Sequence, residues 1–290
     1  TFEKVQADHS IAVVYERDTS VFEYALTGYE GTYDGQPHSV TFDETKLVAG
    51  ETVEYYVNGE KQEGNPQFTN VTNTKVIAKV VTADGTTVWS GEASVTIEKR
   101  NVTLTSATDS KQYDGDPLTN GEVTVSEDGF AEGEGATYNV TGSQTVVGSS
   151  ANTFTYTLNE KTNSANYNIT KIEGTLTVTN RDAKYEITVE ANSDSAKYDG
   201  KEHSVSGIVT NTFKIGNNTY TVEGMDASAS GTDAGEYPVN VIGTAVVKDE
   251  DGNNVTDQFA VKTNAGTLTI SKRNVTLTSA TDSKQYDGDP

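Results

Sequence analysis

Histidine and cysteine, two of the side chains that most often carry out chemistry in proteins, are scarce or absent in this sequence. Its 290 residues include three histidines and no cysteine, which excludes disulfides, thiol nucleophiles and cysteine metal sites. His38 and His203 both follow the glycine of a Tyr-Asp-Gly triplet by three residues, and Leu118 stands at the same place after another copy. A position that accepts either histidine or leucine indicates half-buried packing. We therefore expect no catalytic residue, no metal ligand and no cofactor at these positions.

One acidic stretch, from Asp249 to Asn253, offers clustered carboxylates of the kind that bind calcium. The EF-hand spacing fails, because its sixth position requires glycine and has Asn254, and its twelfth requires glutamate and has Ala260. The Asp-Gly pair within the stretch is typical of a tight hairpin turn. A turn is the prediction, and weak calcium binding stays open as the alternative.

Aromatic residues gather in the first third of the chain, and three of them are candidate ligand-binding residues: Tyr55, Tyr56 and Trp89. Tyrosine and tryptophan are enriched where proteins bind partners, but they are also ordinary core residues. If Tyr55 and Tyr56 lie in a strand, they must point to opposite faces, so one of them is expected to be exposed.

The charge of the chain narrows the classes of partner. Forty-three acidic and 21 basic residues give a net charge of −22, which repels phosphate backbones and anionic lipids. We therefore expect no nucleic acid partner. No stretch approaches the ~20 apolar residues of a membrane span, so no membrane insertion is expected in this segment.

The composition predicts an all-β protein. Threonine, valine and tyrosine are abundant and leucine is rare, which is typical of strands rather than helices. Short alternating segments are separated by turns rich in glycine, aspartate and asparagine. We expect tandem small antiparallel β-sandwich domains of immunoglobulin-like type. A β-grasp fold, which needs a helix across its sheet, is the alternative.

Repeats divide the chain. The stretch from Lys99 to Pro117 recurs unchanged from Lys272 to Pro290, and alternating strands that end in a basic residue precede each new unit. These markers predict the end of a preceding repeat (1–17), three repeats (18–100, 101–181 and 182–273) and the start of a further one (274–290). No flexible linker lies between the repeats, so a semi-rigid rod is expected.

A Tyr-Asp-Gly triplet marks each unit, and it occurs at Tyr33, Tyr113, Tyr198 and Tyr286. A turn explains it better than a binding site, because glycine provides the backbone freedom, aspartate bonds its own backbone and tyrosine packs over the corner.

The pattern from KQYDGDPLTNGEVTV to NYNITKIEGTLTVT resembles the Tyr-Asp-Gly type tandem repeats of Gram-positive bacterial surface proteins, which occur alongside mucin-binding-type repeats. The resemblance covers nearly the whole chain. It implies an extracellular segment on the bacterial cell surface, held to the cell wall through other parts of the parent protein. It implies no catalytic residue.

The resulting prediction is a non-enzymatic stalk or spacer of an adhesin whose repeats contact their neighbours. The first rival is a binding module for a host glycoprotein or immunoglobulin, with its site in the repeat 18–100. A strand added at an exposed sheet edge is a second way to bind, for which segments 1–17 and 274–290 are candidates. The other rival is a glycoside hydrolase that uses two carboxylates, for which small duplicated units leave little room for a cleft.

Overall fold

The computed structural model describes residues 23–126 and 128–288, so the expected repeat end at 1–17 lies outside the described residues. The described part is built of strands, turns and short 3-10 segments, without an α-helix. The all-β sandwich class is confirmed, and the β-grasp alternative, which requires a helix, is wrong. No helix of this part has the length and apolar character needed to cross a lipid bilayer.

By its contacts the chain divides into two compact units. Unit 1 holds the described residues of 1–105, 123–139 and 155–172, and unit 2 holds those of 106–122, 140–154 and 173–290. Strand pairing among the described residues stays within 26–98, 100–179 and 185–271. We keep the names first, middle and third repeat for 18–100, 101–181 and 182–273, whose limits stay a prediction.

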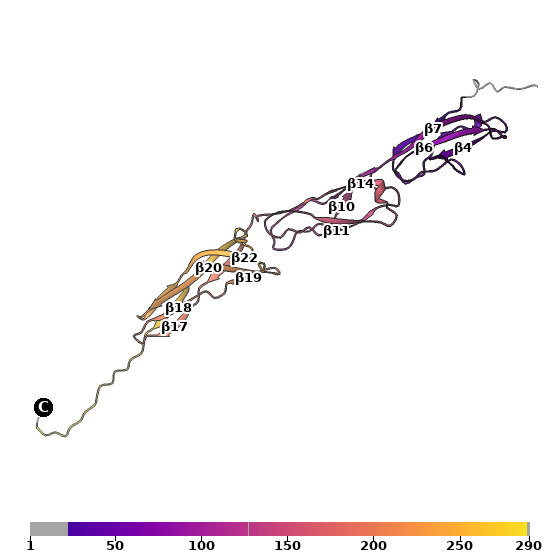
Figure 1. The fold of residues 1–290 in the computed structure, drawn as a ribbon. Coiled ribbons are helices and arrows are strands. Elements are labelled where there is room, and N and C mark those ends of the chain that lie inside the picture. Colours follow the sequence, from indigo (N-terminus) through magenta and orange to yellow (C-terminus); the bar gives the residue numbers. More distant parts are fainter. Residues whose placement is uncertain (1–22, 127, 289–290) are drawn as a thin grey trace, which may run out of the picture. The chain divides into compact units, whose positions relative to one another are not determined.

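The first repeat contains a five-stranded sheet in the order β2-β7-β6-β4-β5 and a separate pair, β1-β3. Figure 1 labels three strands of the larger sheet, β7, β6 and β4. Its core follows from the alternation in β6, where Val76, Ala78 and Val80 are fully buried and the residues between them are less so. The elements are β1 (Leu26–Thr27), β2 (Tyr29–Thr32), β3 (Thr41–Phe42), η1 (Glu44–Lys46), β4 (Thr52–Val57), β5 (Glu60–Lys61), β6 (Thr72–Val81) and β7 (Thr87–Glu98).

The middle repeat contributes three small sheets, β10-β8-β14, β11-β13 and β12-β15-β9. Val102 and Leu104 of β8 are fully buried in unit 1, and Leu176 and Val178 of β15 are buried in unit 2. The elements are β8 (Arg100–Ser106), β9 (Asp109–Gln112), β10 (Val123–Val125), β11 (Ala136–Val140), β12 (Gly148–Ala151), β13 (Phe154–Leu158), η2 (Ser164–Asn166), β14 (Tyr167–Ile172) and β15 (Thr175–Thr179).

The third repeat lies within unit 2 and is built of β16-β23, β17-β24-β21 and a sheet in which β18, β19 and β22 all pair with the long β20 (Figure 1). The elements are β16 (Tyr185–Glu190), β17 (Asp194–Lys197), β18 (His203–Ser206), β19 (Thr212–Ile215), β20 (Asn218–Gly231), β21 (Gly235–Val239), β22 (Val241–Lys248), η3 (Thr256–Gln258), β23 (Phe259–Asn264) and β24 (Gly266–Ser271).

The expectation of antiparallel sheets needs a correction, because each repeat has an opening strand that pairs in parallel, although β1 of the first repeat pairs with β3 in the antiparallel direction. In the third repeat, β16 runs parallel to β23 and β17 runs parallel to β24. The pairs β8·β14, β9·β15 and β2·β7 are parallel as well. Because its first and last strands point the same way, the chain enters the third repeat at one end and leaves it at the other. Tandem connection without a linker requires this arrangement.

The duplicated sequence adopts two conformations. At 99–115 it forms β8 and β9, in which Val102 and Leu104 are fully buried. At 272–288 it forms no strand, and Val275 and Leu277 are 74% and 92% exposed. β14 and β15 supply the partner backbone at the first location. Pairing with distant strands, and not local propensity, therefore makes this sequence a strand.

Candidate functional site

The Tyr-Asp-Gly turn has the same backbone geometry in each repeat. Its glycine lies in the left-handed region, with φ of 80° at Gly35, 88° at Gly115 and 80° at Gly200. The aspartate accepts a hydrogen bond from the backbone N–H two residues on, at 2.8 Å from Gln36 N to Asp34 Oδ1 in the first copy. These two features confirm that the triplet is a turn in which aspartate bonds its own backbone.

The tyrosine of the triplet reaches beyond its own repeat. In unit 1, the side chain of Tyr33 is 4% exposed, and its hydroxyl donates a hydrogen bond to the carboxylate of Glu134 in the middle repeat. Tyr167 donates to the other carboxylate oxygen at 2.9 Å. The two tyrosine rings meet edge to face, with 5.4 Å between their centroids. One carboxylate thus joins the first repeat to the middle one. We call this contact between Tyr33, Glu134 and Tyr167 the joint of unit 1.

Arg100 closes this joint from the other side. Its guanidinium donates to the backbone oxygen of Tyr33 at 3.3 Å and to that of Gly129 at 2.8 Å, and it also contacts the oxygen of Asp128. These carbonyl groups belong to the turn of the first repeat and to a loop of the middle repeat. The basic residue that marks the repeat limit in the sequence therefore fastens the two backbones together.

A buried amide completes the joint in unit 1. Asn166, at the end of η2, is 1% exposed. Its Oδ1 accepts from the backbone N–H of Val71 at 3.0 Å, and its Nδ2 donates to Oδ1 of Asn70 at 2.9 Å. Because both ends of the amide are paired with the first repeat, it fixes one register between the two repeats.

Unit 2 contains a joint of the same design between the middle and third repeats. Tyr113 is 1% exposed, and its hydroxyl donates to the hydroxyl of Tyr220 at 3.3 Å. The ring of Tyr220 lies edge to face against Phe259, with 4.8 Å between centroids. The guanidinium of Arg181 donates to the backbone oxygen of Tyr113 at 2.9 Å, as Arg100 does to Tyr33.

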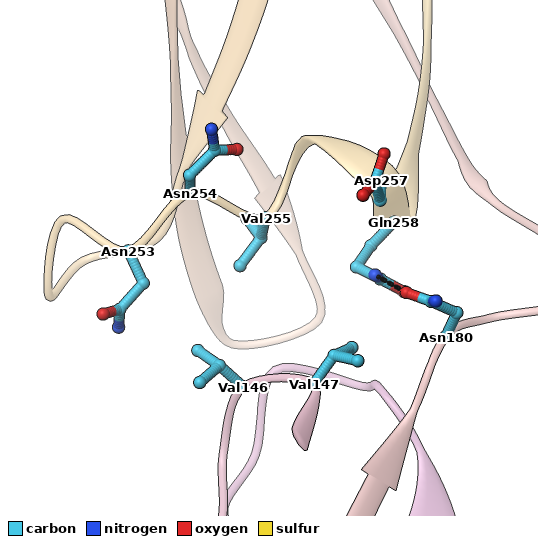
Figure 2. A pocket seen from close by; sticks show the side chains of 8 residues that line it. All are labelled: Val146, Val147, Asn180, Asn253, Asn254, Val255, Asp257 and Gln258. Carbon is cyan, nitrogen blue, oxygen red and sulfur yellow. Dashed lines mark hydrogen bonds between the residues drawn. The ribbon is translucent and has the colours of Figure 1, made fainter.

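Gln258 is a buried amide whose two ends are both hydrogen-bonded to the preceding repeat, as those of Asn166 are. We call this arrangement the amide clamp. It lies at the end of η3 and is 2% exposed. Its Oε1 accepts from the backbone N–H of Arg181 at 3.0 Å, and its Nε2 donates to Oδ1 of Asn180 at 2.6 Å. Figure 2 shows this second bond as a dashed line between the two facing amides.

A pocket of about 420 Å³ lies beside this clamp. In Figure 2, Val146 and Val147 come from a loop of the middle repeat and Val255 from the third repeat, and their side chains face one another. Among the described residues that line it, Asp257 is the one ionisable side chain, so the lining carries no acid–base pair. The lining residues are Val146, Val147, Asn180, Asn253, Asn254, Val255, Asp257 and Gln258.

One apolar cluster runs through the joint of unit 2. It contains Leu176 and Val178 of β15 together with Tyr113, and it continues into Tyr220 and Phe259. The two repeats therefore share buried apolar surface, which opposes their separation because apolar area would return to water.

Burial changes the acid–base behaviour of the joint tyrosines. The pKa of Tyr33 is raised above its usual value, mainly by burial of the hydroxyl and to a smaller extent by its hydrogen bond to Glu134. Burial likewise raises the pKa of Tyr113, and it raises that of Tyr167 to about 12. Each phenol stays protonated at neutral pH and donates its hydrogen bond there.

The three predicted ligand-binding residues do not share one face. Tyr55 is 4% exposed and faces the core. Tyr56 points to the outer face, where its hydroxyl donates to Glu54 and Lys79 lies over its ring at 4.5 Å. Trp89 pairs with Val80 on the core face and contacts Phe42, with 5.6 Å between ring centroids. The prediction that Tyr55 and Tyr56 face opposite ways is confirmed, while ligand binding by the three stays a prediction.

The two triplet-associated histidines lie in matching surroundings. His38 Nε2 is 3.0 Å from Oδ1 of Asp34, and His203 Nε2 is 3.0 Å from Oδ1 of Asp199. The ring of His38 also stacks on Tyr29 at 3.8 Å. Both side chains are partly buried, in agreement with a packing position. Within the described residues, no group of three or more histidines and carboxylates is placed to hold a metal ion.

The acidic stretch forms the predicted turn. Oδ1 of Asp249 accepts from the backbone N–H groups of Asp251 and Asn253, and Gly252 has a φ of 82°. These bonds hold the Asp249 side chain against its own backbone.

Most residues of the joints were not predictable from the sequence. The tyrosines were expected as turn residues and the arginines as boundary markers, but Glu134, Asn166 and Gln258 were not singled out. One signal was available. In the middle and third repeats, an amide residue followed by an aromatic one stands at the start of the penultimate strand. These pairs are Asn166-Tyr167 at β14 and Gln258-Phe259 at β23.

No family model and no curated protein sequence matches the chain. Among solved structures, SGBP-B of the mixed-linkage glucan utilization locus of Bacteroides ovatus, in complex with a mixed-linkage heptasaccharide, is 14% identical, with 96% of this chain and 74% of that one covered and a TM-score of 0.18. A bacterial ice-binding adhesin is 13% identical, with 87% and 98% covered and a TM-score of 0.27. The fibronectin(III)-like modules of Clostridium thermocellum CbhA are 10% identical, with 90% and 100% covered and a TM-score of 0.20. Nothing about this chain's function follows from likenesses at these TM-scores.

Proposed function

We propose that the chain is a non-enzymatic repeat segment of a Gram-positive bacterial cell-surface protein, where it acts as the stalk or spacer of an adhesin. The observation that carries the proposal is the burial of Tyr33 and Tyr113 in the following repeat. A segment that serves only to hold distance needs such joints and needs no catalytic cleft.

The joints provide what a spacer requires. An arginine binds the backbone of the turn, a tyrosine packs into the next repeat and an amide pairs with the preceding one. Because these contacts are buried or partly buried, a change of angle at a joint would break hydrogen bonds and expose apolar surface together.

Charge and attachment fit this role. A net charge of −22 keeps an exposed, repetitive chain soluble and discourages its association with other copies. In the proposal, cell-wall attachment comes from other parts of the parent protein, and the neighbouring repeats of the same chain are the main partners.

Small-angle X-ray scattering tests the spacer role. The double variant Tyr33→Ala and Tyr113→Ala should give a broader, shorter distribution of distances, measured at a temperature where circular dichroism shows that its strands remain folded despite the loss of stability. Tyr198→Ala, in the same turn of the third repeat, is the matched control and should leave the profile unchanged. Equal profiles for the double variant and the unaltered chain would contradict the proposal.

One observation supports a second candidate, a binding module for a host glycoprotein or immunoglobulin. Tyr56 and Trp89 remain partly exposed in the first repeat, on the two faces of its sheet. A screen of the chain against mucins, matrix proteins, immunoglobulins and glycans tests this role. Saturable binding that Tyr56→Ala or Trp89→Ala removes would support it, provided that Lys214→Ala in the third repeat has no effect. The absence of binding to every member of the panel would count against it.

A further inference from the structure

The Tyr-Asp-Gly turn of the third repeat is built like the other two but is uncovered. The backbone N–H of Tyr198 donates to the oxygen of Ser271 at 2.9 Å, as that of Tyr113 donates to Thr179 at 2.9 Å. Yet the side chain of Tyr198 is 39% exposed, whereas that of Tyr113 is 1% exposed. The local turn is complete, and the difference between the two tyrosines lies in what covers them.

The glycines of the turns show the same difference. A Cβ atom on Gly35 would lie 3.3 Å from Cβ of Ala131 in the middle repeat. A Cβ atom on Gly115 would lie 2.3 Å from the hydroxyl of Tyr220. A Cβ atom on Gly200 would meet nothing within 4 Å. The first two turns are thus pressed against a following repeat, and the third presents an open surface of the same design.

Two features show which kind of repeat this surface fits. The turns of the first and third repeats both carry a histidine bonded to the turn aspartate at 3.0 Å, where the middle repeat has Leu118. In addition, the residues from Lys272 onward are identical to those from Lys99 onward, which open the middle repeat. The end of the third repeat therefore matches the end of the first repeat, which a middle-type repeat covers.

We propose that the Tyr198 turn is a docking surface for a second module of the middle-repeat type, 101–181. In this joint, the counterpart of Glu134 accepts the hydrogen bond of the Tyr198 hydroxyl, and the counterpart of Tyr167 packs against the Tyr198 ring. The guanidinium of Arg273 donates to the backbone oxygen of Tyr198, as that of Arg100 does to the backbone oxygen of Tyr33. This interaction goes beyond the spacer role, because it concerns which module binds and not how far the array extends.

An extended chain tests the proposal. Because residues 272–290 repeat 99–117, adding residues 118–181 after Pro290 places a complete middle-type repeat after the third one without introducing a foreign junction. Hydrogen exchange read by mass spectrometry compares the 198–203 turn in the original and extended chains. We expect exchange in this turn to slow by at least about tenfold in the extended chain. The turn that follows Tyr33 should be unchanged in both.

A matched variant separates docking from mere extension. In the extended chain, replacing only the appended counterpart of Glu134 by alanine should restore fast exchange at the Tyr198 turn while the appended repeat stays folded. Tyr198→Ala should lower the melting temperature of the appended repeat. An appended repeat that folds but leaves the turn exchanging as in the original chain overturns the proposal. An appended repeat that fails to fold also overturns the proposal, because the same residues do fold when they follow the first repeat.

Discussion

The tyrosine of the Tyr-Asp-Gly turn is 4% exposed at Tyr33, 1% at Tyr113 and 39% at Tyr198. The three side chains leave turns of equal geometry, so their energetic roles differ only through the residues that cover them. Buried aromatic rings contribute several kcal/mol through apolar burial and packing, whereas a half-exposed ring contributes much less. At this scale, the joint depends on side chains that belong to different repeats.

Truncation of these tyrosines should therefore give unequal effects. We expect Tyr113→Ala to destabilise unit 2 by about 3–5 kcal/mol, because it removes a buried ring and the partner of the Tyr220 hydroxyl. Tyr198→Ala should cost less than about 1 kcal/mol. Urea denaturation of the two variants measures both values, and similar midpoints would contradict this assignment.

Alkaline pH should loosen the joints. Burial raises the pKa of Tyr113, and it raises that of Tyr167 to about 12 from a usual 10.0. For a group whose pKa is raised on folding, the stabilisation is complete below the unfolded-state pKa, and it is lost as the pH rises toward the folded-state pKa. Stability should thus fall between about pH 10 and pH 12.

Melting temperatures measured across this range test the alkaline effect. Tyr113→Phe keeps the ring but cannot ionise, so its stability should depend less on pH than that of the unaltered chain. A pH dependence that Tyr113→Phe leaves unchanged would show that other groups cause the loss.

Part of the joint was predictable from single residues. Gly35 and Asp34 act as turn residues in the way their types predict, and Tyr55 and Tyr56 point to opposite faces as strand geometry requires. The amide clamp was not predictable, because Asn166 pairs with Asn70, 96 residues earlier. An asparagine is equally common in exposed turns, and its sequence neighbours do not reveal a distant buried partner.

At the scale of elements, the duplicated sequence separates local propensity from tertiary pairing. Its alternating valine and leucine predict a strand, and one copy forms β8 beside β14. The other copy, at 272–288, forms none. Alternation thus identified where strands can form, but it does not encode which strand pairs with which, nor in which direction. For that reason the parallel pairs were missed while the all-β class was predictable.

The two copies supply a matched pair of substitutions in identical sequence. Leu104→Ala removes a fully buried side chain and should destabilise the chain by about 2–5 kcal/mol. Leu277→Ala changes a side chain that is 92% exposed and should change stability by less than about 0.5 kcal/mol. Thermal melting of both variants checks this, and equal losses would mean that the second copy is also packed.

At the scale of the whole molecule, each of the two units contains one joint, and the apolar cluster of unit 2 extends across its joint. Substitutions at a joint should therefore affect both repeats that meet there, whereas a substitution in an uncovered turn should stay local. The glycines of the turns allow this difference to be measured.

Gly115→Ala and Gly200→Ala place the same strain on a left-handed backbone, since φ is 88° and 80°. Only the first adds a methyl group where the hydroxyl of Tyr220 lies. We expect Gly115→Ala to lower the melting temperature of both repeats that meet in unit 2, and Gly200→Ala to affect the third repeat alone. Calorimetry that shows the same transitions for both variants would contradict the shared joint.

The parallel pairing of first and last strands has a mechanical consequence. When the two ends of the third repeat are pulled apart, β17 and β24 are drawn past each other along their own length, because the chain enters through β16 and β17 and leaves through β24. Their backbone hydrogen bonds then carry the load side by side and must break together, whereas a hairpin pulled at its open end would lose them one after another. The same holds for β2 and β7 in the first repeat. Connectivity alone thus gives each of these repeats resistance to tension along the chain.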